Sequence, residues 1–323
     1  MPQPELPLLV IVGTTASGKT ALSLALAEAL DGEVVSADSV QIYRHFDIGS
    51  GKPTAVELER VRHHFIGTHD PHDAIDAAGW ANLAETAVTA IANRGRRPIV
   101  CGGSFLWVRA LLFGLAPAPA ANPELREEYQ RIANEQGRAE LHRRLQLVDA
   151  ATAQKLAPND FVRVSRALEV FELTGIQMSQ WQAEHGFRQA KRPYVLLGVL
   201  RERAELDERI RTRAAQMLAA GLVAEVVGLC QRGYDKARAM GSVGYREVYT
   251  ALAASGVKSP SDIDTQAVLE EISRKTRVFA RRQRTWLRDE PVHYLPPHVL
   301  RDRAALVAAV REASGITELS DIG

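Results

Sequence analysis

Short apolar runs alternate with helical segments over the first hundred residues. Runs at 8–12, 33–36 and 98–101 are rich in β-branched residues and end at turn residues, as buried parallel strands do. Residues 19–30 repeat leucine at helical spacing, and 80–93 form a second helical stretch. This alternation predicts an α/β fold, in which a parallel sheet is flanked by helices on both faces.

The pattern changes after residue 115. A Pro/Ala segment at 116–123 cannot continue a helix, and 124–184 is helix-like with few β-branched runs. A strand is then expected at 194–200. We infer three parts: an α/β core (1–115), a helical insertion domain (116–192), and a part that completes the core and adds helices (193–323). Helices are expected there at 205–220, 223–231, 244–253 and 268–288, and a strand at 292–295.

The first predicted strand and helix flank a match to G-x-x-x-x-G-K-[ST], the phosphate-binding P-loop. The match consists of Gly13, Thr14, Thr15, Ala16, Ser17, Gly18, Lys19 and Thr20. Backbone N–H groups of such a loop converge on phosphate oxygens at a helix N-terminus. Lys19 is expected to bridge terminal phosphate oxygens and Thr20 to ligate Mg²⁺. The motif specifies a diphosphate, and the P-loop NTPase-like fold follows from its position.

The expected acid at the end of the 98–101 strand is missing, and Asp38 follows the second strand instead. Ligands of parallel α/β sheets bind at the carboxyl ends of strands, so Asp38 should stand near the P-loop. It could serve as a catalytic carboxylate or as the N-cap of a helix that starts near Val40. Gln41 and Tyr43 could contact a base or be ordinary surface residues. The missing acid argues against an ordinary kinase.

Composition and charge describe an ordinary globular chain, with 323 residues, 46% hydrophobic and a net charge of +1. Segment 273–288 is an exception, since it holds seven basic residues and no acid. Arg274, Arg277, Arg281, Arg284 and Arg288 are spaced to form one helical stripe. That stripe suits RNA phosphates, or is a solvated face. Trp286 and Leu287 are expected to pack in the core.

No apolar run is long enough to span a membrane, and no signal peptide is expected. The two cysteines, Cys101 and Cys230, form neither a disulfide framework nor a zinc motif, which suits a reducing cytoplasm. We expect a monomer without a membrane partner.

Several further short sequence motifs make the identification of a family more specific than the P-loop alone does. They are GTTASGKT (13–20), ADSVQIY (37–43), DIGSGKP (47–53), HHFI (63–66), CGGS (101–104), PELR (123–126), VRVSRALEV (162–170), VGYRE (243–247) and ARRQRTWLR (280–288). In order and spacing, from residue 13 to 287, they resemble the tRNA dimethylallyltransferase family, also called tRNA isopentenyltransferases. The resemblance implies transfer of a dimethylallyl group from dimethylallyl diphosphate to N6 of the adenosine 3′ of a tRNA anticodon. Diphosphate is released with the help of Mg²⁺, and the helical insertion embraces the anticodon stem-loop.

Residue roles follow from the resemblance together with the chemistry. The catalytic set is Asp38, as the base that accepts the amine proton, with Ser104, Lys19 and Arg213. The diphosphate is bound by residues 13–20 and by Arg213, which shares a helix face with Arg209. The tRNA is bound by Asp38, Ser39, Val40, Gln41, Ser104, Arg126, Val162, Arg163, Val164, Ser165, Arg166, Gly244, Tyr245 and Arg246. The charge pattern adds Arg281 and Arg284 to the tRNA contacts.

The chain departs modestly from the family pattern, at Ser50, Gly51, Ser104 and 76–80, and two other functions remain open. After Asp70-Pro71 the family usually has Ser-Ala-x-x-Phe, whereas this chain has Asp-Ala-Ala-Gly-Trp at 76–80. Ser104 could donate to the bridging oxygen or cap its helix. The alternatives to prenyl transfer are a P-loop kinase of a small metabolite or nucleoside and an RNA-binding NTPase without transfer chemistry.

Overall fold

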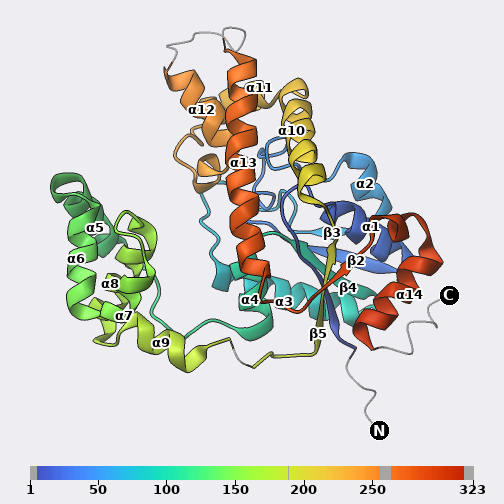
Figure 1. Cartoon of the computed structure of the whole chain (residues 1–323), viewed down its shortest axis with the longest axis horizontal. Coiled ribbons are helices and arrows are strands. Elements are labelled where there is room, and N and C mark those ends of the chain that lie inside the picture. Colours follow the sequence, from blue (N-terminus) through green and yellow to red (C-terminus); the bar gives the residue numbers. More distant parts are fainter. Residues whose placement is uncertain (1–5, 188, 255–262, 316–323) are drawn as a thin grey trace. The chain divides into compact units, whose positions relative to one another are not determined.

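The computed structural model describes residues 6–187, 189–254 and 263–315. It divides into two compact units. The larger combines Met1–Leu112 with Lys191–Gly323, and the smaller comprises Phe113–Ala190. The two units are described separately below (Figure 1).

A six-stranded parallel sheet forms the centre of the larger unit. Its strands are β1 (Leu8–Ile11), β2 (Gly32–Ala37), β3 (His63–His64), β4 (Arg97–Gly102), β5 (Tyr194–Val199) and β6 (Val292–Leu295). They lie in the order β3-β2-β4-β1-β5-β6. The α/β prediction is confirmed, as are the five strands expected from the sequence. The pattern does not predict β3, which is too short to show a periodicity.

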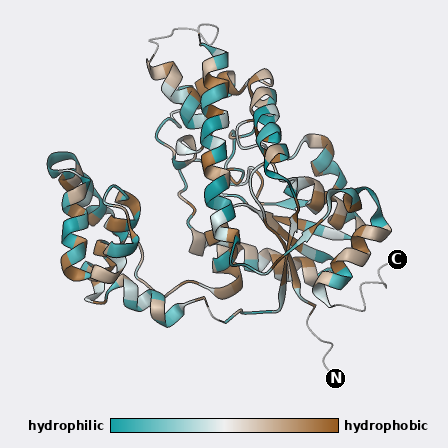
Figure 2. Ribbon diagram, in the orientation of Figure 1, coloured by the Kyte–Doolittle hydropathy of each residue, from teal (hydrophilic) through white to brown (hydrophobic). Residues whose placement is uncertain are grey.

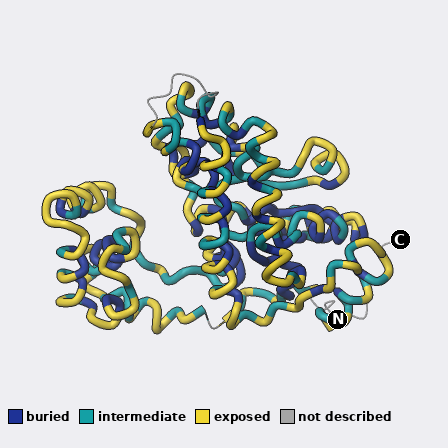
Figure 3. The backbone as a smooth tube through the Cα atoms, turned by 45° about the horizontal axis from the view of Figure 1, so that its top comes forward, coloured by how far each residue is buried: buried dark blue, intermediate teal, exposed yellow. Residues whose placement is uncertain are grey.

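One face of the sheet is covered by α1 (Lys19–Ala29) and α14 (Arg303–Ser314). Alternate strand residues such as Leu9 and Ile11 pack with Leu22 and Leu26 of α1 into one buried cluster. Figure 3 shows the inner strands of this sheet mainly in the colour of buried residues. Burial of both strand faces explains why β1 and β5 are continuously apolar instead of alternating.

Of two further helices, α3 (Ala77–Asn93) packs on β2 and β4, and α4 (Phe105–Phe113) contacts α3 through its tryptophan. The Asp76 carboxylate starts α3 by accepting a hydrogen bond from the backbone N–H of Gly79. Trp80 is fully buried, stacks on Trp107 and donates its indole N–H to the Ser36 carbonyl. The 76–80 segment that departs from the family pattern therefore has a structural role at the start of α3.

The other helices of this unit lie beyond the sheet. They are α2 (Ala55–Arg60), α10 (Arg203–Ala219), α11 (Leu222–Gln231), α12 (Tyr245–Ala254), α13 (Thr265–Leu287) and the 3-10 helices η1 (Arg238–Gly241) and η3 (Pro297–Arg301). The four helices expected at 205–220, 223–231, 244–253 and 268–288 are confirmed within a few residues. The pattern does not predict α2 and α14. Among the described residues no single helix is long and apolar enough to cross a membrane. The pair α10 and α11 reaches that length and composition only together, and it is bent by 58°.

The smaller unit is entirely helical. It holds α5 (Pro123–Gln136), α6 (Arg138–Val148), α7 (Ala150–Lys155), α8 (Phe161–Thr174) and α9 (Met178–His185). Leu141, Leu145 and Val164 form its core with Tyr129 and Ile132. Asn122 caps α5, directly after the Pro/Ala segment, by accepting from the Leu125 N–H. The helical character expected for 124–184 is confirmed.

A buried carboxylate fastens the edge strand β3 and the end of α3 to the sheet. The Glu33 side chain is only 2% exposed and accepts hydrogen bonds from His64 at 2.7 Å and Arg94 at 2.8 Å. Arg62 adds an ion pair at 3.7 Å. Burial by itself would raise the pKa of Glu33, but the hydrogen bonds from His64 and Arg94 prevail and hold it below its ordinary value.

This lowered pKa makes Glu33 a source of acid-sensitive stability. A carboxyl with a lowered folded pKa stabilises the protein above its unfolded pKa, about 4.3, and that stability is lost as the pH falls through the folded pKa. Glu33→Gln should therefore lower the free energy of unfolding by about 1–3 kcal/mol at pH 7 and flatten its decline below about pH 4.3. Urea unfolding between pH 2.5 and 7 measures both. The exposed Glu59→Gln is the control, and parallel pH profiles for the two variants would contradict this account.

Candidate active site

The P-loop lies between β1 and α1 in a conformation that its small residues permit. Gly18 caps α1 with a φ of 104°, which L side chains rarely adopt. Ala16 also lies in the left-handed region, at 66°. A Cβ at Gly13 would approach the Ser17 hydroxyl to 2.8 Å. The loop is thus tight enough that glycine is required where its backbone turns and where it meets Ser17.

Two arginines that follow β5 donate hydrogen bonds to backbone carbonyls of this loop. The Arg201 Nε donates to the Ser17 carbonyl at 3.1 Å, and the Arg209 Nε donates to the Ala16 carbonyl at 2.8 Å. These bonds satisfy loop carbonyls and bring two cations next to the phosphate cradle. Arg209 was considered in the sequence only as a neighbour of Arg213, and Arg201 was missed. No motif marks Arg201, which is placed by the register of β5.

A buried glutamine of α13 connects two loops of the site. The Gln283 Oε1 accepts from the Thr15 backbone N–H at 2.8 Å, and its amide donates to the Gly103 carbonyl at 3.2 Å. Lys19 folds onto the same loop and donates to the Thr14 carbonyl at 2.9 Å. Gln283 was also missed by sequence reasoning. The feature of the sequence that could have identified it is an uncharged polar residue within a helix segment rich in arginine.

Asp38 stands in a turn after β2, and the helix expected near Val40 is absent there. Its Oδ1 accepts the backbone N–H groups of Val40 at 2.9 Å and Gln41 at 3.2 Å. The prediction that Asp38 caps a helix is therefore wrong, because no helix starts there. Its carboxylate nevertheless accepts backbone N–H groups as a cap would, and so stabilises a turn. Within the described part of the chain, the structure gives Oδ2 no hydrogen-bond donor.

The neighbouring hydroxyls connect this turn to the end of β4. Ser104 Oγ accepts from the Ser39 backbone N–H at 3.0 Å and lies 3.2 Å from the Ser39 hydroxyl. Ser104 directly precedes α4, and its backbone N–H donates to the Ala37 carbonyl. The three motifs that the sequence singles out separately, at 13–20, at Asp38 and at Ser104, therefore meet at the carboxyl ends of β1, β2 and β4.

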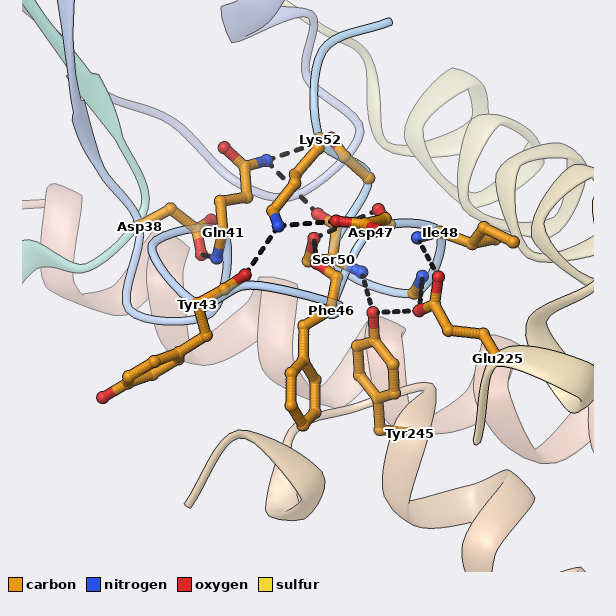
Figure 4. Close-up of polar contacts among 12 residues, drawn as sticks. Asp38, Gln41, Tyr43, Phe46, Asp47, Ile48, Ser50, Lys52, Glu225 and Tyr245 are labelled. Carbon is orange, nitrogen blue, oxygen red and sulfur yellow. Dashed lines mark hydrogen bonds and ion pairs between the residues drawn. The ribbon is translucent and has the colours of Figure 1, made fainter. Parts of the chain in front are cut away.

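Next to the Asp38 turn, the 46–53 loop is held by Glu225 of α11 and Tyr245 of α12 (Figure 4), and Arg213 of α10 also contacts it. Glu225 of α11 accepts the backbone N–H groups of Ile48 at 2.7 Å and Gly49 at 3.3 Å. The Tyr245 hydroxyl donates to Glu225 at 2.5 Å and accepts the Ser50 N–H at 3.1 Å. The loop then presents the Ser50 carbonyl to Arg213 at 3.3 Å.

Two side chains of the 38–53 segment complete this framework. The Gln41 amide donates to the Ser50 and Gly51 carbonyls, at 3.2 and 3.0 Å. The Lys52 ammonium bonds the Tyr43 carbonyl and the Asp47 carboxylate, both at 2.6 Å. The Asp38 turn and the Arg213 contact are consequently parts of one hydrogen-bonded structure.

Opposite charges face one another in the site. Burial lowers the pKa of Lys19 and Arg213 lowers it further, while Cys101 and Asp38 act in the opposite direction. Burial also lowers the pKa of Arg213, against the charge of Asp38. These poorly hydrated cations would gain strongly from an anion placed among them. The arrangement fits a diphosphate that approaches the loop from the Asp38 side.

The oxygen donors present fit a magnesium ion that is held jointly with a ligand. Thr20 offers a hydroxyl on the P-loop helix, an oxygen donor of the type that Mg²⁺ takes. Among the described residues no group of three or more His, Cys, Asp or Glu side chains could hold a metal by itself. Phosphate oxygens and water would therefore have to supply the remaining ligands.

Several residues expected to contact RNA have other surroundings in the larger unit. Tyr43 is 1% exposed and Tyr245 is fully buried. Neither side chain can stack on or bind a base without unfolding its surroundings, so these two expectations are corrected. Gly244, at φ 100°, starts α12 and donates its N–H to Glu247, while Arg246 is exposed and pairs with that same carboxylate. Arg246 is the accessible member of this block.

The smaller unit arranges two expected RNA contacts around one buried acid. The Glu169 side chain is fully buried and accepts from Arg126 at 3.1 Å and from Arg166 at 2.5 Å. It also accepts the Asn122 N–H at 2.7 Å. The two guanidinium groups, which remain partly exposed, are thereby held in place beside the Pro/Ala segment.

The other members of this block divide by exposure. Val162 is 73% exposed, and Arg163 is exposed and paired with Asp160. Val164 and Ser165 are buried in the helical core. The expectation of direct RNA contact is therefore corrected for the side chains of Val164 and Ser165.

Comparison with known proteins adds an independent finding. The family model described as IPP transferase matches residues 41–290. A relative named tRNA dimethylallyltransferase from Sorangium cellulosum is 56% identical over 288 residues, covering 89% of this chain and 90% of that protein. Another relative, named tRNA dimethylallyltransferase 1, from Trichlorobacter lovleyi, is 46% identical over 286 residues, with coverage of 88% and 91%.

Solved structures agree with these relatives. The full-length tRNA isopentenylpyrophosphate transferase from Bacillus halodurans is 32% identical, with a TM-score of 0.66 and coverage of 96% of this chain and 99% of that one. A eukaryotic dimethylallyltransferase acting on tRNA has a TM-score of 0.74 at 22% identity and coverage of 96% and 80%, a likeness of fold alone. The expected P-loop NTPase-like fold is confirmed.

The clamp on the 46–53 loop can be tested through Glu225. Glu225→Ala leaves the N–H groups of Ile48 and Gly49 without their acceptor, which should cost about 1–3 kcal/mol of stability. Because the loop positions Ser50 against Arg213, the affinity for inorganic diphosphate should fall as well. Thermal unfolding and calorimetric titration with diphosphate measure the two effects. Glu208→Ala, an exposed acid on α10, is the control, and equal values for both variants would refute the clamp.

Proposed function

The chain belongs to the IPP transferase family, and from this we infer that it transfers a dimethylallyl group from dimethylallyl diphosphate to N6 of an adenosine in tRNA. The structural observation that carries the inference is the position of Asp38. A carboxylate with an uncommitted oxygen stands at the end of β2, next to the end of β4, whereas the acid that a kinase carries at the end of the β4 strand is missing. Such a group can take a proton from an acceptor while the loop holds a leaving diphosphate.

The donor half of the reaction needs stabilisation of negative charge. As the bond from carbon to the bridging oxygen breaks, charge accumulates on the departing diphosphate. The backbone of residues 13–20, Lys19 and Arg213 would bind this anion in a partly dehydrated site. Bound Mg²⁺ would neutralise phosphate charge, with Thr20 as its protein ligand on the loop.

The acceptor half needs a base. The lone pair of the exocyclic adenosine amine is delocalised into the ring, so the amine is a weak nucleophile and becomes acidic as it attacks carbon. Asp38 would accept that proton on Oδ2, while the two N–H bonds at Oδ1 keep the carboxylate in position. Ser104, which is joined to this turn through Ser39, would lie beside the target nucleotide.

The target nucleotide has to leave its stack before it can react. Proteins read RNA sequence mainly in single-stranded loops, and a flipped base costs a few kcal/mol to extrude. We assign the target to the adenosine immediately 3′ of the anticodon. The groups proposed to bind the stem-loop are the exposed Arg126, Val162, Arg163 and Arg246 and the half-buried Ser39, Val40, Gln41 and Arg166.

One incubation distinguishes this function from its alternatives. The enzyme is mixed with Mg²⁺, dimethylallyl diphosphate and an unmodified anticodon stem-loop, and the RNA is analysed by mass spectrometry. Prenyl transfer predicts RNA heavier by one dimethylallyl group, with diphosphate released and no ATP consumed. A parallel reaction with ATP in place of the donor should yield no phosphorylated product. Phosphorylation there, with RNA unchanged in the first reaction, would identify a kinase instead.

The assignment of Asp38 as base leads to a separate prediction. Asp38→Asn keeps the shape and the hydrogen bonds at Oδ1 but cannot accept the proton, so the single-turnover rate should fall about 10²–10⁴-fold. The affinity for tRNA should change little. Rapid quench with excess enzyme measures the rate, and Asp73→Asn, an exposed acid after β3, serves as the control. A rate near that of the wild type would exclude Asp38 as the base.

A further inference from the structure

Helix α13 carries an uncharged polar side chain on its buried side. Figure 2 shows the helix largely in hydrophilic colours along its length. Its exposed arginines, among them Arg281 and Arg284, line a cavity shared with α10. Gln283 lies on a different face and is only 5% exposed. A buried amide is costly unless its donor and acceptor are satisfied, so the partners of Gln283 show what it holds.

The amide of Gln283 bridges the P-loop and the turn that follows β4. Its Oε1 accepts the Thr15 backbone N–H at 2.8 Å, and its Nε2 donates to the Gly103 carbonyl at 3.2 Å. The two contacts need an acceptor and a donor at the end of one side chain of this length, which glutamine alone supplies. Methionine would fill the same space without either hydrogen bond.

Gly103 leaves the room that this amide occupies. A Cβ at Gly103 would lie 2.7 Å from the Gln283 Nε2, whereas its distance to the Lys19 Nζ would be an ordinary 3.8 Å. The backbone of Gly103 does not lie in the left-handed region, so its conformation does not require glycine. Close packing against Gln283 is therefore the reason for glycine at this position.

The same helix also holds the residue that follows Ser104. Trp286 stacks on Phe105 at the start of α4, with ring centres 4.8 Å apart and an angle of 13° between the rings. The expectation that Leu287 packs in the core is confirmed, and Trp286 is half-buried in this stack. Residues three apart share a helix face, so Gln283 and Trp286 hold the 103–105 segment at two points, with Ser104 between them.

The two halves of the proposed reaction use different loops, and their separation has to be fixed. The P-loop would hold the leaving diphosphate, while Ser104, joined through Ser39 to the Asp38 turn, faces the attacking amine. Building on the proposed function, we propose that Gln283 is a positioning residue that fixes the P-loop against the Ser104 turn. It acts through these loops and not on the reacting atoms. A displacement of about 1 Å in such an alignment can cost about 10²-fold in rate.

Gln283→Met tests the proposal because it removes both hydrogen bonds at nearly constant volume. The single-turnover rate at saturating donor and RNA should fall about 10- to 100-fold. The affinity for inorganic diphosphate should stay near that of the wild type, because Lys19, Arg213 and the other N–H groups of the loop are unchanged. Rapid quench and calorimetry measure the two quantities, and thermal unfolding verifies that the variant is folded. Gln266→Met, at an exposed glutamine near the start of α13, is the control.

A second variant breaks the same bridge from its other end. Gly103→Ala places a Cβ against the Gln283 amide and should displace it, so it should lower the rate and spare the diphosphate affinity in the same way. When two substitutions break one contact, their effects do not add. The double variant should therefore be no slower than the slower single variant. Losses that multiply would show separate actions and overturn the proposal.

The remaining outcomes separate this proposal from the proposed function. An active wild type together with an unchanged rate in Gln283→Met would refute the positioning role alone. A lower affinity for diphosphate with an unchanged saturated rate would make Gln283 a donor-binding residue, which also overturns the proposal. If Gln283→Met fails to fold, the same two measurements on Gly103→Ala decide. Wild-type protein that binds diphosphate but never prenylates RNA would refute the proposed function and this role with it.

Discussion

The site depends on the parallel pairing of β2, β4 and β1. Ala37 of β2 lies opposite Gly102 of β4, and Cys101 of β4 lies opposite Ile11 of β1. The three strands therefore end at the same edge of the sheet. A Cβ at Gly102 would collide with the Ala37 backbone, which explains why the strands can approach so closely only with glycine there. This register places Asp38, Ser104 and the P-loop within reach of one ligand, although Asp38 is 18 residues beyond Thr20 and Ser104 a further 66 residues along the chain.

Buried carboxylates play a different part from Asp38. Burial of a charge is costly unless donors surround it. Glu33 meets His64 and Arg94, and Glu169 meets Arg126, Arg166 and a backbone N–H. These acids are saturated and serve to hold other groups. Asp38 accepts two bonds on one oxygen only and is partly exposed, so it retains the capacity to accept a proton. Carboxylates whose oxygens all have donors are thus structural, whereas one with a free oxygen can take part in proton transfer.

Local patterns predict the elements and the motifs but not the contacts that arise from packing. Short runs rich in apolar and β-branched residues predict five of the six strands, and the P-loop is recognised because its flanking strand and helix are present. The absence of a helix at Val40 and the burial of Tyr43 depend on how the 46–53 loop folds back, which no local pattern encodes. Gln283 and Arg201 are missed for the same reason, since α13 and the end of β5 reach the P-loop only through the tertiary arrangement. Resemblance to a family assigns a role to a whole motif. It therefore predicted RNA contact for buried residues of the motif, such as Val164, as well as for exposed ones.

Helix α10 connects two positively charged regions of the larger unit. Arg203 lines a cavity between α10 and α13, while Arg209 and Arg213, six and ten residues later, donate to the Ala16 and Ser50 carbonyls. A helix is rigid over this length, so a force on Arg203 reaches the P-loop through the backbone and not through solvent. An anion bound beside Arg203 would shift α10 only as a unit, together with the groups that surround the diphosphate. Any difference that such a shift makes to the binding free energy of the diphosphate must, by linkage, equal the difference that the diphosphate makes to the binding of that anion.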